Sequence, residues 1–286
     1  MQHAGIHAIR VGDITVTALN DGQFEASVDY IVGLDRAVAA EQEAAMFRPL
    51  PPRITINAFL LEIGGKKALI DTGCGTAFGP NMGGSMARMN SLGVADADIE
   101  TILITHAHID HVSGLLTPEG APRFANAELV INAAETGFWL DEATANAAPE
   151  SAKDSFALAK RCLSPYAART RKVGMGQEVL PGVTCHPLPG HTPGHSGWLI
   201  SSGADSLLVW GDVVHLPGIQ FAYPEAGMTF DTDADMARTS RSRVLAWASA
   251  DRLMVAGMHL DFAPFGHVVA DGRAYSFIPQ VWQPSA

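Results

Sequence analysis

The chain has 286 residues, of which 47% are hydrophobic, so it can bury the core of one large domain or of two modest ones. Its 30 acidic and 19 basic residues give a formal net charge of -11, and the chain has no basic run, which argues against nucleic-acid binding. No apolar run reaches the roughly 18 residues of a membrane-spanning helix, and residues 1–7 lack the features of a signal peptide. The 3 cysteines are unpatterned, which suits reduced thiols, so we expect a cytoplasmic protein.

The predicted elements begin with an extension over residues 1–50. It contains a strand-like run at 14–19 and an alanine-rich, helix-like run at 36–47. A proline-dense stretch at 49–52 separates it from a main domain over residues 51–286. We expect the extension to pack on the functional site or on a second subunit, and a homodimer is one expectation for the assembly.

Beyond residue 50, apolar strands and helix-like segments follow one another along the chain. Polar, turn-rich segments follow several strands, which argues for two packed sheets flanked by helices. Strands are predicted at residues 54–63, 67–71, 100–105, 128–131, 197–201, 206–210 and 252–256, helices at 81–92, 133–141, 151–162 and 233–249, and a hairpin at 268–278.

The heptapeptide at residues 105–111, THAHIDH, follows a predicted strand and concentrates imidazoles and a carboxylate. A single histidine is more often a core or surface residue, but His106, His108, Asp110 and His111 together indicate a metal site. Imidazole and carboxylate suit zinc and its first-row neighbours, whereas calcium or magnesium sites would be all oxygen. A catalytic zinc ion keeps a position open for water, so this many candidates in one segment favour two ions over one.

Further candidates stand just after other apolar strands. His191 lies in the turn-rich segment 189–196, PGHTPGHS. Asp212 follows the strand predicted at 206–210 and is a candidate bridge between two ions, and His259 follows an apolar run at 253–258. The pattern of a strand followed by a ligand therefore recurs along the chain.

With these residues the sequence resembles the metallo-β-lactamase-fold hydrolases, whose His-x-His-x-Asp-His signature stands at 106–111, and the resemblance extends over roughly residues 54 to 270. It implies an α/β (α+β) fold, the four-layer αββα sandwich, with a catalytic domain over residues 51–286. It also implies that Asp71, in the sequence LIDTG, holds a ligand histidine from behind. The ligand sets that the resemblance implies are His106, His108 and His191 for one ion, Asp110, His111 and His259 for the other, and Asp212 between them.

Within this superfamily the chain is most similar to the methyl parathion hydrolase group, on the stretches 78–80, 137–140, 163–166, 190–195 and 266–268. That match implies an apolar mouth around the metals, lined by Phe78, Trp139, Phe156 and Phe230. The chain departs from the group at His215, where an apolar residue is usual. His215 is either a proton donor to a leaving alkoxide or a hydrogen-bonded supporting residue, and both interpretations stay open.

The expected mechanism follows from the ions. Two divalent ions roughly 3.5 to 4 Å apart lower the pKa of a bridging water towards 7, so a metal-bridging hydroxide attacks and no serine or cysteine nucleophile is needed. Asp110 and Asp212 are the candidate catalytic residues: both coordinate, and Asp110 can accept the proton released on attack. Zinc is the expected metal, with manganese, cobalt or iron as alternatives, because availability often decides between them.

Three functional classes compete. The first is a hydrolase of lactones or aryl esters that also accepts phosphotriesters, as an apolar mouth would favour. The second is a β-lactam hydrolase or a thioester hydrolase like glyoxalase II, but these would need a basic group for an anionic substrate, and no lysine or arginine stands beside the motifs. The third is a non-catalytic metal-binding protein, which the full ligand set disfavours. An oxidative iron protein is also conceivable, although no flavin-binding domain is present.

Overall fold

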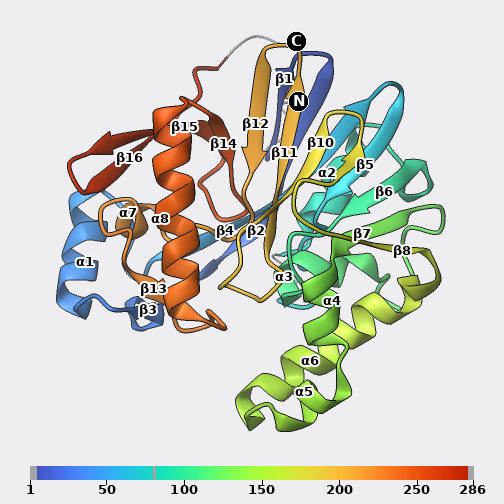
Figure 1. Ribbon diagram of the computed structural model, residues 1–286, viewed down its shortest axis with the longest axis horizontal. Coiled ribbons are helices and arrows are strands. Elements are labelled where there is room, and N and C mark those ends of the chain that lie inside the picture. The colour runs from blue at the N-terminus through green and yellow to red at the C-terminus, as the bar shows by residue number, and fades with distance from the viewer. Residues whose placement is uncertain (1–4, 80–81, 283–286) are drawn as a thin grey trace.

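The computed structural model describes residues 5–79 and 82–282, and this part of the chain forms two seven-stranded sheets packed face to face (Figure 1). Pro80 of the 78–80 stretch and Asn81, the expected start of a helix, lie outside the described residues. The first sheet has the order β1 (Ile6–Val11), β2 (Ile14–Glu25), β4 (Arg53–Ile63), β5 (Lys66–Ile70), β6 (Ile99–Leu103), β7 (Glu128–Asn132) and β8 (Thr170–Val173). The second has the order β16 (Ala274–Pro279), β15 (Phe265–Asp271), β14 (Met254–Ala256), β12 (Asp205–Val209), β11 (Ser196–Ser202), β10 (Val183–Pro187) and β9 (Glu178–Leu180).

The core between the sheets is apolar on both inner faces. Phe59 of β4 and Leu103 of β6 pack in one buried cluster with Trp198 of β11, Val209 of β12 and Phe265 of β15. Because alternate residues of a strand point to opposite faces, each strand supplies this core with one set of side chains and the outer layers with the other. This contact is the central interface of the sandwich.

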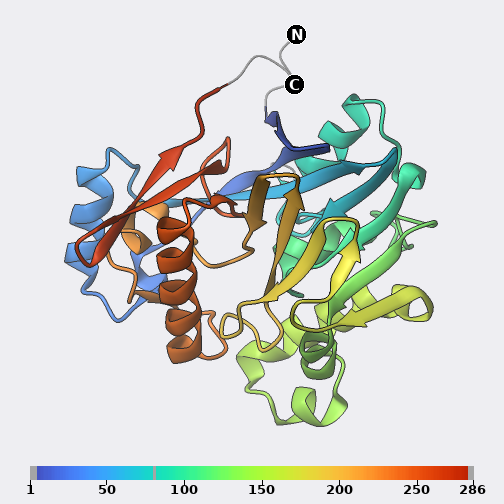
Figure 2. The same cartoon turned by 45° about the horizontal axis from the view of Figure 1, so that its top comes forward.

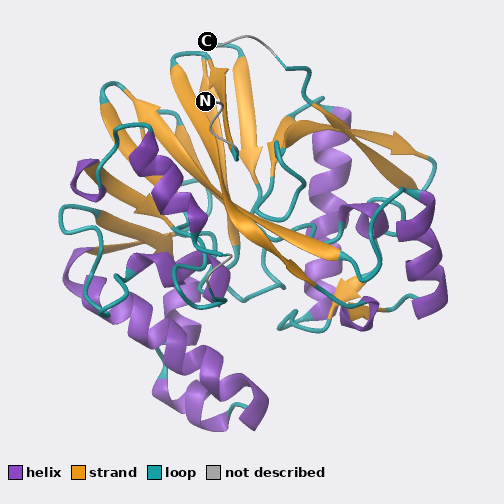
Figure 3. Ribbon diagram, turned by 180° about the vertical axis from the view of Figure 1, so that it is seen from behind, coloured by secondary structure: helices purple, strands orange, loops and turns teal. Residues whose placement is uncertain are grey.

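Helices cover the outer faces of both sheets, as Figures 2 and 3 show. On the second sheet, Val244 and Leu245 of the long helix α8 pack against Leu208 and Val255. The helices and their bounds are α1 (Arg36–Ala45), α2 (Gly84–Ser91), α3 (Ile109–Val112), α4 (Ala133–Trp139), α5 (Glu142–Ala147), α6 (Glu150–Leu163), α7 (Pro217–Gln220) and α8 (Ala234–Ala250). The predicted αββα sandwich is confirmed. None of the helices in the described ranges is long and apolar enough to cross a bilayer.

The amino-terminal segment is part of the first sheet. Strand β2 pairs with β4 from Thr15 opposite Glu62 to Glu25 opposite Arg53, with one register shift between Asn20 and Gly22, so residues of the predicted extension share a sheet with the main domain. The segment then forms β3 (Ile31–Val32), which pairs with β13 (Gly227–Met228), and helix α1. The extension therefore packs along the sandwich, next to the segments that follow β12.

Parallel pairing brings the functional segments to one edge. Strands β5, β6 and β7 run parallel in the first sheet, and β12 and β14 run parallel in the second. The carboxyl ends of parallel strands meet at the same edge of a sheet, so the segments that follow them lie close together. The candidate ligands all lie in segments that follow strands of the two sheets: β6 in the first sheet, and β10, β12 and β14 in the second.

Candidate metal centre

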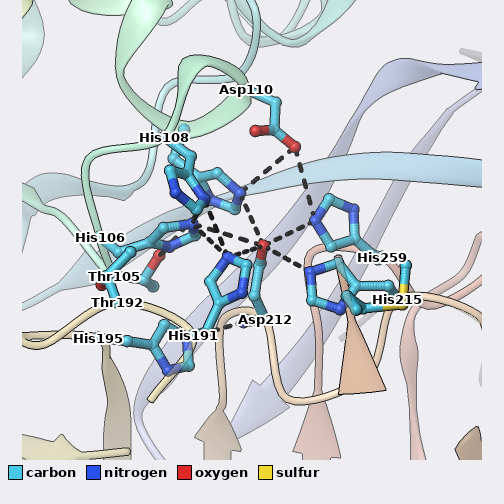
Figure 4. A network of polar contacts seen from close by, with 12 residues as sticks. Thr105, His106, His108, Asp110, His191, Thr192, His195, Asp212, His215 and His259 are labelled. Atoms are coloured by element: carbon cyan, nitrogen blue, oxygen red, sulfur yellow. Dashed lines mark hydrogen bonds and ion pairs between the residues drawn. The ribbon is translucent and has the colours of Figure 1, made fainter. Parts of the chain in front are cut away.

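Figure 4 shows the candidate ligands converging on the carboxylate of Asp212. Asp212 lies just after β12 and His259 just after β14, and the parallel pairing of these strands brings the two side chains together. His191 lies in the turn between β10 and β11, next along the same sheet. The second sheet thus supplies three of the seven candidates from neighbouring segments.

The other four candidates follow β6 in the first sheet. His106 and His108 stand two residues apart in the segment before helix α3, and the backbone at His108 is extended. Asp110 and His111 belong to α3 itself, a single helical turn. The change from extended to helical backbone after His108 aims the two pairs at different points.

One donor set consists of His106, His108, His191 and Asp212. The Nε2 atom of His106 lies 3.1 Å from Nδ1 of His108 and 3.1 Å from Nε2 of His191, and the last two atoms are 3.0 Å apart. Asp212 Oδ2 lies 3.2 Å from His191 Nε2 and 3.5 Å from His106 Nε2. A tetrahedral ion with nitrogen ligands at about 2.0–2.1 Å would separate them by roughly 3.3 Å, so these spacings fit one.

Hydrogen bonding alone does not account for this triangle of ring nitrogens. Each ring nitrogen offers either one proton or one lone pair, so three mutually close nitrogens cannot all be paired with one another. A cation at the centre would use all of their lone pairs at once. The geometry of His106, His108 and His191 therefore fits a metal ion.

The second donor set combines Asp110, His111 and His259 with the same oxygen of Asp212. Asp110 Oδ2 lies 3.4 Å from His111 Nε2 and 3.5 Å from His259 Nε2. Asp212 Oδ2 lies 3.3 Å and 3.0 Å from the same two nitrogens. Among the described residues His111 Nε2 is buried without a hydrogen-bond partner, which a cation here would supply. The two sets and their shared oxygen fit a dinuclear site for divalent ions.

Asp71 lies behind this second set. Its Oδ2 atom is 2.7 Å from Nδ1 of His111 and also accepts a hydrogen bond from the hydroxyl of Thr105, while its Oδ1 accepts from the Thr105 backbone N–H. The bond to Nδ1 leaves the lone pair of His111 Nε2 facing the donor set. This is the arrangement expected of a residue that holds a ligand histidine from behind.

Two further supports were not predicted. Asp231 Oδ1 lies 2.8 Å from His191 Nδ1, and the backbone carbonyl of Thr55 in β4 lies 2.8 Å from His259 Nδ1. Both contacts direct Nε2 of the histidine towards the centre. Asp231 stands in a turn before α8, where no sequence pattern distinguishes it, and a backbone carbonyl leaves no sequence signal at all.

Two other histidines, His195 and His267, are not in the ligand sets and have different surroundings. The ring of His195 is buried: its Nδ1 contacts the carbonyl of Leu188, and its Nε2 accepts the backbone N–H of Asp212 at 2.8 Å. It therefore holds the segment that carries the shared carboxylate. His267 lies on β15 with Nδ1 at the carbonyl of Arg252, outside the cluster of candidate ligands.

The carboxylates around the centre attract positive charge. Burial lowers the pKa of His191, but hydrogen bonds to Asp212 and Asp231 outweigh burial and raise it to about 9. Burial also opposes the charged form of His111, yet the carboxylates that face it raise its pKa well above the usual value. Burial and the neighbouring His191 lower the pKa of His108 to about 3. A divalent ion would replace the protons held here.

A cavity of about 400 Å³ opens above the candidate ligands. Of the residues predicted around the metals, Phe78, His215 and Phe230 line it. Trp139 and Phe156 do not line it, because they fill the interface between α4 and α6, with ring centroids 4.8 Å apart and exposures of only 4% and 6%. The other apolar residues of the lining are Phe24, Tyr30, Ile54, Ala107, Ile109 and Leu158.

Comparison with known proteins gives a consistent picture. A model of the Metallo-beta-lactamase superfamily matches residues 51–259. Among curated proteins, an N-acyl homoserine lactonase from Bacillus sp. is 31% identical over 114 residues, which are 40% of this chain and only 38% of that relative. The solved hydrolase AbOPH of the beta lactamase superfamily has a TM-score of 0.94 and 29% identity, covering 99% of this chain and 100% of its own. AidC, a dizinc quorum-quenching lactonase solved with N-hexanoyl-L-homoserine as product, has a TM-score of 0.92 and 25% identity over 98% of this chain and 99% of AidC.

Proposed function

The chain belongs to the metallo-beta-lactamase superfamily, and we propose that this metal-dependent hydrolase cleaves lactones and aryl esters. We propose that it also accepts phosphotriesters such as methyl parathion. One observation carries the proposal: two donor sets that share Asp212 Oδ2 form the floor of an apolar cavity. Sites of this kind serve hydrolysis, because two ions activate water and hold the developing charge. The lactonase relatives support lactones as the first substrate class.

The proposed ions are zinc, held by His106, His108, His191 and Asp212 on one side and by Asp110, His111, His259 and Asp212 on the other. Nitrogen and oxygen donors suit zinc, and manganese, cobalt or iron are the alternatives. When bound, the ions would lower the pKa of a water that they share and would polarise the carbonyl or phosphoryl oxygen of the substrate.

The protein side chains supply the remaining steps. Asp212 keeps the two donor sets close, because its Oδ2 belongs to both. Asp110 has a side chain that is 14% exposed and lines the cavity, so it can accept the proton released when water attacks. His215 lines the wall beside Phe230, with ring centroids 5.0 Å apart. Its Nε2 lies 3.1 Å from Asp212 Oδ2, and its buried Nδ1 has no hydrogen-bond partner among the described residues. We assign the His215 ring to the leaving-group oxygen.

The cavity lining favours uncharged substrates. Among the described residues that line it there is no lysine or arginine, while Asp110, Asp154 and Asp212 supply negative charge. A β-lactam carboxylate or the glutathione part of a thioester would find no cation there apart from the ions. This disfavours the β-lactamase and glyoxalase II alternatives.

The segment before residue 51 is proposed to complete the cavity, because Phe24 and Tyr30 belong to its lining. A homodimer stays a prediction. Met46, Phe47 and Leu50 are exposed apolar residues of the same segment, and Phe47 is 98% exposed. Light scattering at several protein concentrations would measure the mass of the assembly.

The deciding experiment compares kcat/KM of the zinc-loaded protein for an acyl-homoserine lactone, a simple aromatic lactone, a dimethyl aryl phosphotriester and a β-lactam. We expect the lactones to be turned over best and the β-lactam worst. A preference for the phosphotriester would mean a pocket shaped for organophosphates, and a preference for the β-lactam would refute the proposal. His108→Ala serves as the control, since full activity of this variant would point to a non-catalytic metal site.

A further inference from the structure

Glu135 is a buried carboxylate close to the candidate centre but outside its ligand set. It lies in the first turn of α4, and its side chain is fully buried. No arginine or lysine in the described ranges forms a salt bridge with it, and burial raises the pKa of its carboxyl group. A carboxylate without a cationic partner must be stabilised by neutral hydrogen-bond donors.

Its Oε1 atom accepts two hydrogen bonds on the side of the histidine motif. The backbone N–H of Ala107 donates at 2.8 Å, and the indole N–H of Trp139 donates at 2.7 Å. Ala107 stands between His106 and His108, so this bond fixes the backbone that carries both. The Trp139 ring meets the His108 ring edge-on, with centroids 5.5 Å apart.

Its Oε2 atom accepts two hydrogen bonds from the opposite loop. The hydroxyl of Thr192 donates at 2.7 Å and the backbone N–H of Gly194 at 2.9 Å. Thr192 directly follows His191. A side chain at Gly194 would lie 2.1 Å from the backbone nitrogen of Glu135, so this loop rests directly on the start of α4. One carboxylate therefore joins the loop of His106 and His108 to the loop of His191.

The second donor set has different supports. Its histidines, His111 and His259, are held by Asp71 and by the Thr55 carbonyl, and neither of these contacts Glu135. The connection made by Glu135 is thus specific to one of the two donor sets.

We propose that Glu135 is a positioning residue for the ion held by His106, His108 and His191, and that it acts on this ion much more than on its neighbour. The inference rests on the proposed function, because it needs two ions in the centre. It goes further, since Glu135 neither binds an ion nor lines the cavity.

Glu135→Gln is a sharp test, because an amide has one acceptor oxygen while the site presents donors on both sides. The amide NH₂ group then faces either the N–H groups of Ala107 and Trp139 or the N–H of Gly194 and the hydroxyl of Thr192, which can turn to accept a hydrogen bond from it. In either orientation at least one backbone N–H, that of Ala107 or that of Gly194, loses its acceptor. Loss of such an outer partner typically weakens metal binding by about 10- to 100-fold.

The measurement is a cobalt titration of chelator-stripped protein, followed by visible absorption and by metal analysis after gel filtration. We expect two ions in the wild type and a 10- to 100-fold weaker affinity for one of them in Glu135→Gln. Glu43→Gln is the matched control, because Glu43 is the other buried glutamate among the described residues, lies on α1 and pairs with Arg48 at 3.7 Å. This variant should bind both ions as the wild type does.

Thr192→Val is the second variant and keeps the inference testable if Glu135→Gln does not fold, as judged by circular dichroism. It removes a single donor and should weaken the same ion by a smaller factor. Unchanged affinity for both ions in the folded variants would overturn the inference, as would equal weakening of both. A wild-type protein that binds fewer than two ions would instead overturn the proposed function, and the inference with it.

Discussion

Replacement of Asp231 by asparagine tests whether the carboxylate behind His191 controls metal affinity. The side chain of Asp231 is 1% exposed and its Oδ1 lies 2.8 Å from His191 Nδ1, while its Oδ2 accepts the backbone N–H of Met228 at 2.8 Å. The asparagine amide can accept only one of these two bonds. Asp231→Asn therefore either releases the ring of His191 or disturbs the turn that presents it.

The expected magnitude follows from the same contact. A buried hydrogen bond to a charged group contributes about 1.5–3 kcal/mol. Loss of a carboxylate behind a ligand histidine typically lowers metal affinity by about 10- to 100-fold, which corresponds to about 1.4–2.8 kcal/mol. Because the two ranges agree, we expect half-maximal activity of Asp231→Asn at a free zinc concentration about 10- to 100-fold higher than in the wild type.

The assay is lactonase activity at free zinc concentrations set by a chelator buffer. Activity of Asp231→Asn should recover largely at saturating zinc, because the ligands themselves are intact. Asp233→Asn is the control: it removes the same charge two residues away, where Asp233 caps α8 by accepting the N–H of Met236. An equal shift in Asp233→Asn would mean that long-range charge controls affinity, and no shift in Asp231→Asn would refute the role of the contact.

The remaining predictions concern leaving groups, the mouth, the fold and the ions. His215→Leu should lower kcat/KM for esters with poor leaving groups more than for activated aryl esters, and equal losses would remove His215 from the leaving-group step. Phe230→Ala should raise KM for long acyl chains more than for short ones in steady-state kinetics, because Phe230 lines the cavity and is 37% exposed. Arg241→Met should lower the free energy of unfolding by about 2–4 kcal/mol in urea denaturation, because the buried guanidinium donates hydrogen bonds to the carbonyls of Pro224, Val213 and Ala226. Removal of the ions by a chelator should lower Tm, since ligand present at 100 times Kd stabilises the folded state by about 2.7 kcal/mol.

The sequence predicted the parts of the site that depend on local spacing. The candidates from His106 to His111 lie within six consecutive residues, so their closeness in the sequence already keeps them close in space. Asp231 was missed because its partner His191 is 40 residues away, and only the fold brings the pair into contact. Phe24 and Tyr30 were missed for the same reason, since their place in the cavity follows from the pairing of β2 with β4 and of β3 with β13.

For the fold, long elements were predicted better than short ones. The helix predicted at 233–249 is α8, Ala234–Ala250, because a long amphipathic pattern defines its own limits. Short elements carry too few residues for any period, so the two-residue strands β3 and β13 and the six-residue helix α5 were not predicted. Trp139 was assigned to the cavity mouth because an aromatic residue in a helix looks the same in the sequence whether it faces a pocket or a neighbouring helix.

Part of the cavity lining comes from outside the stretch of chain that supplies the candidate ligands. The stretch that matches the superfamily, residues 51–259, contains every candidate ligand. Asp21 precedes this stretch, yet its carboxylate accepts hydrogen bonds from the backbone N–H groups of Cys74, Gly83 and Ser85 and so holds both ends of the loop that carries Phe78. Phe24 lies three residues further along β2 and stacks on Phe78, with centroids 5.8 Å apart. Changes in this amino-terminal strand should therefore alter which substrates enter without altering the ions, and a variant such as Phe24→Ala should change KM while its metal content stays the same.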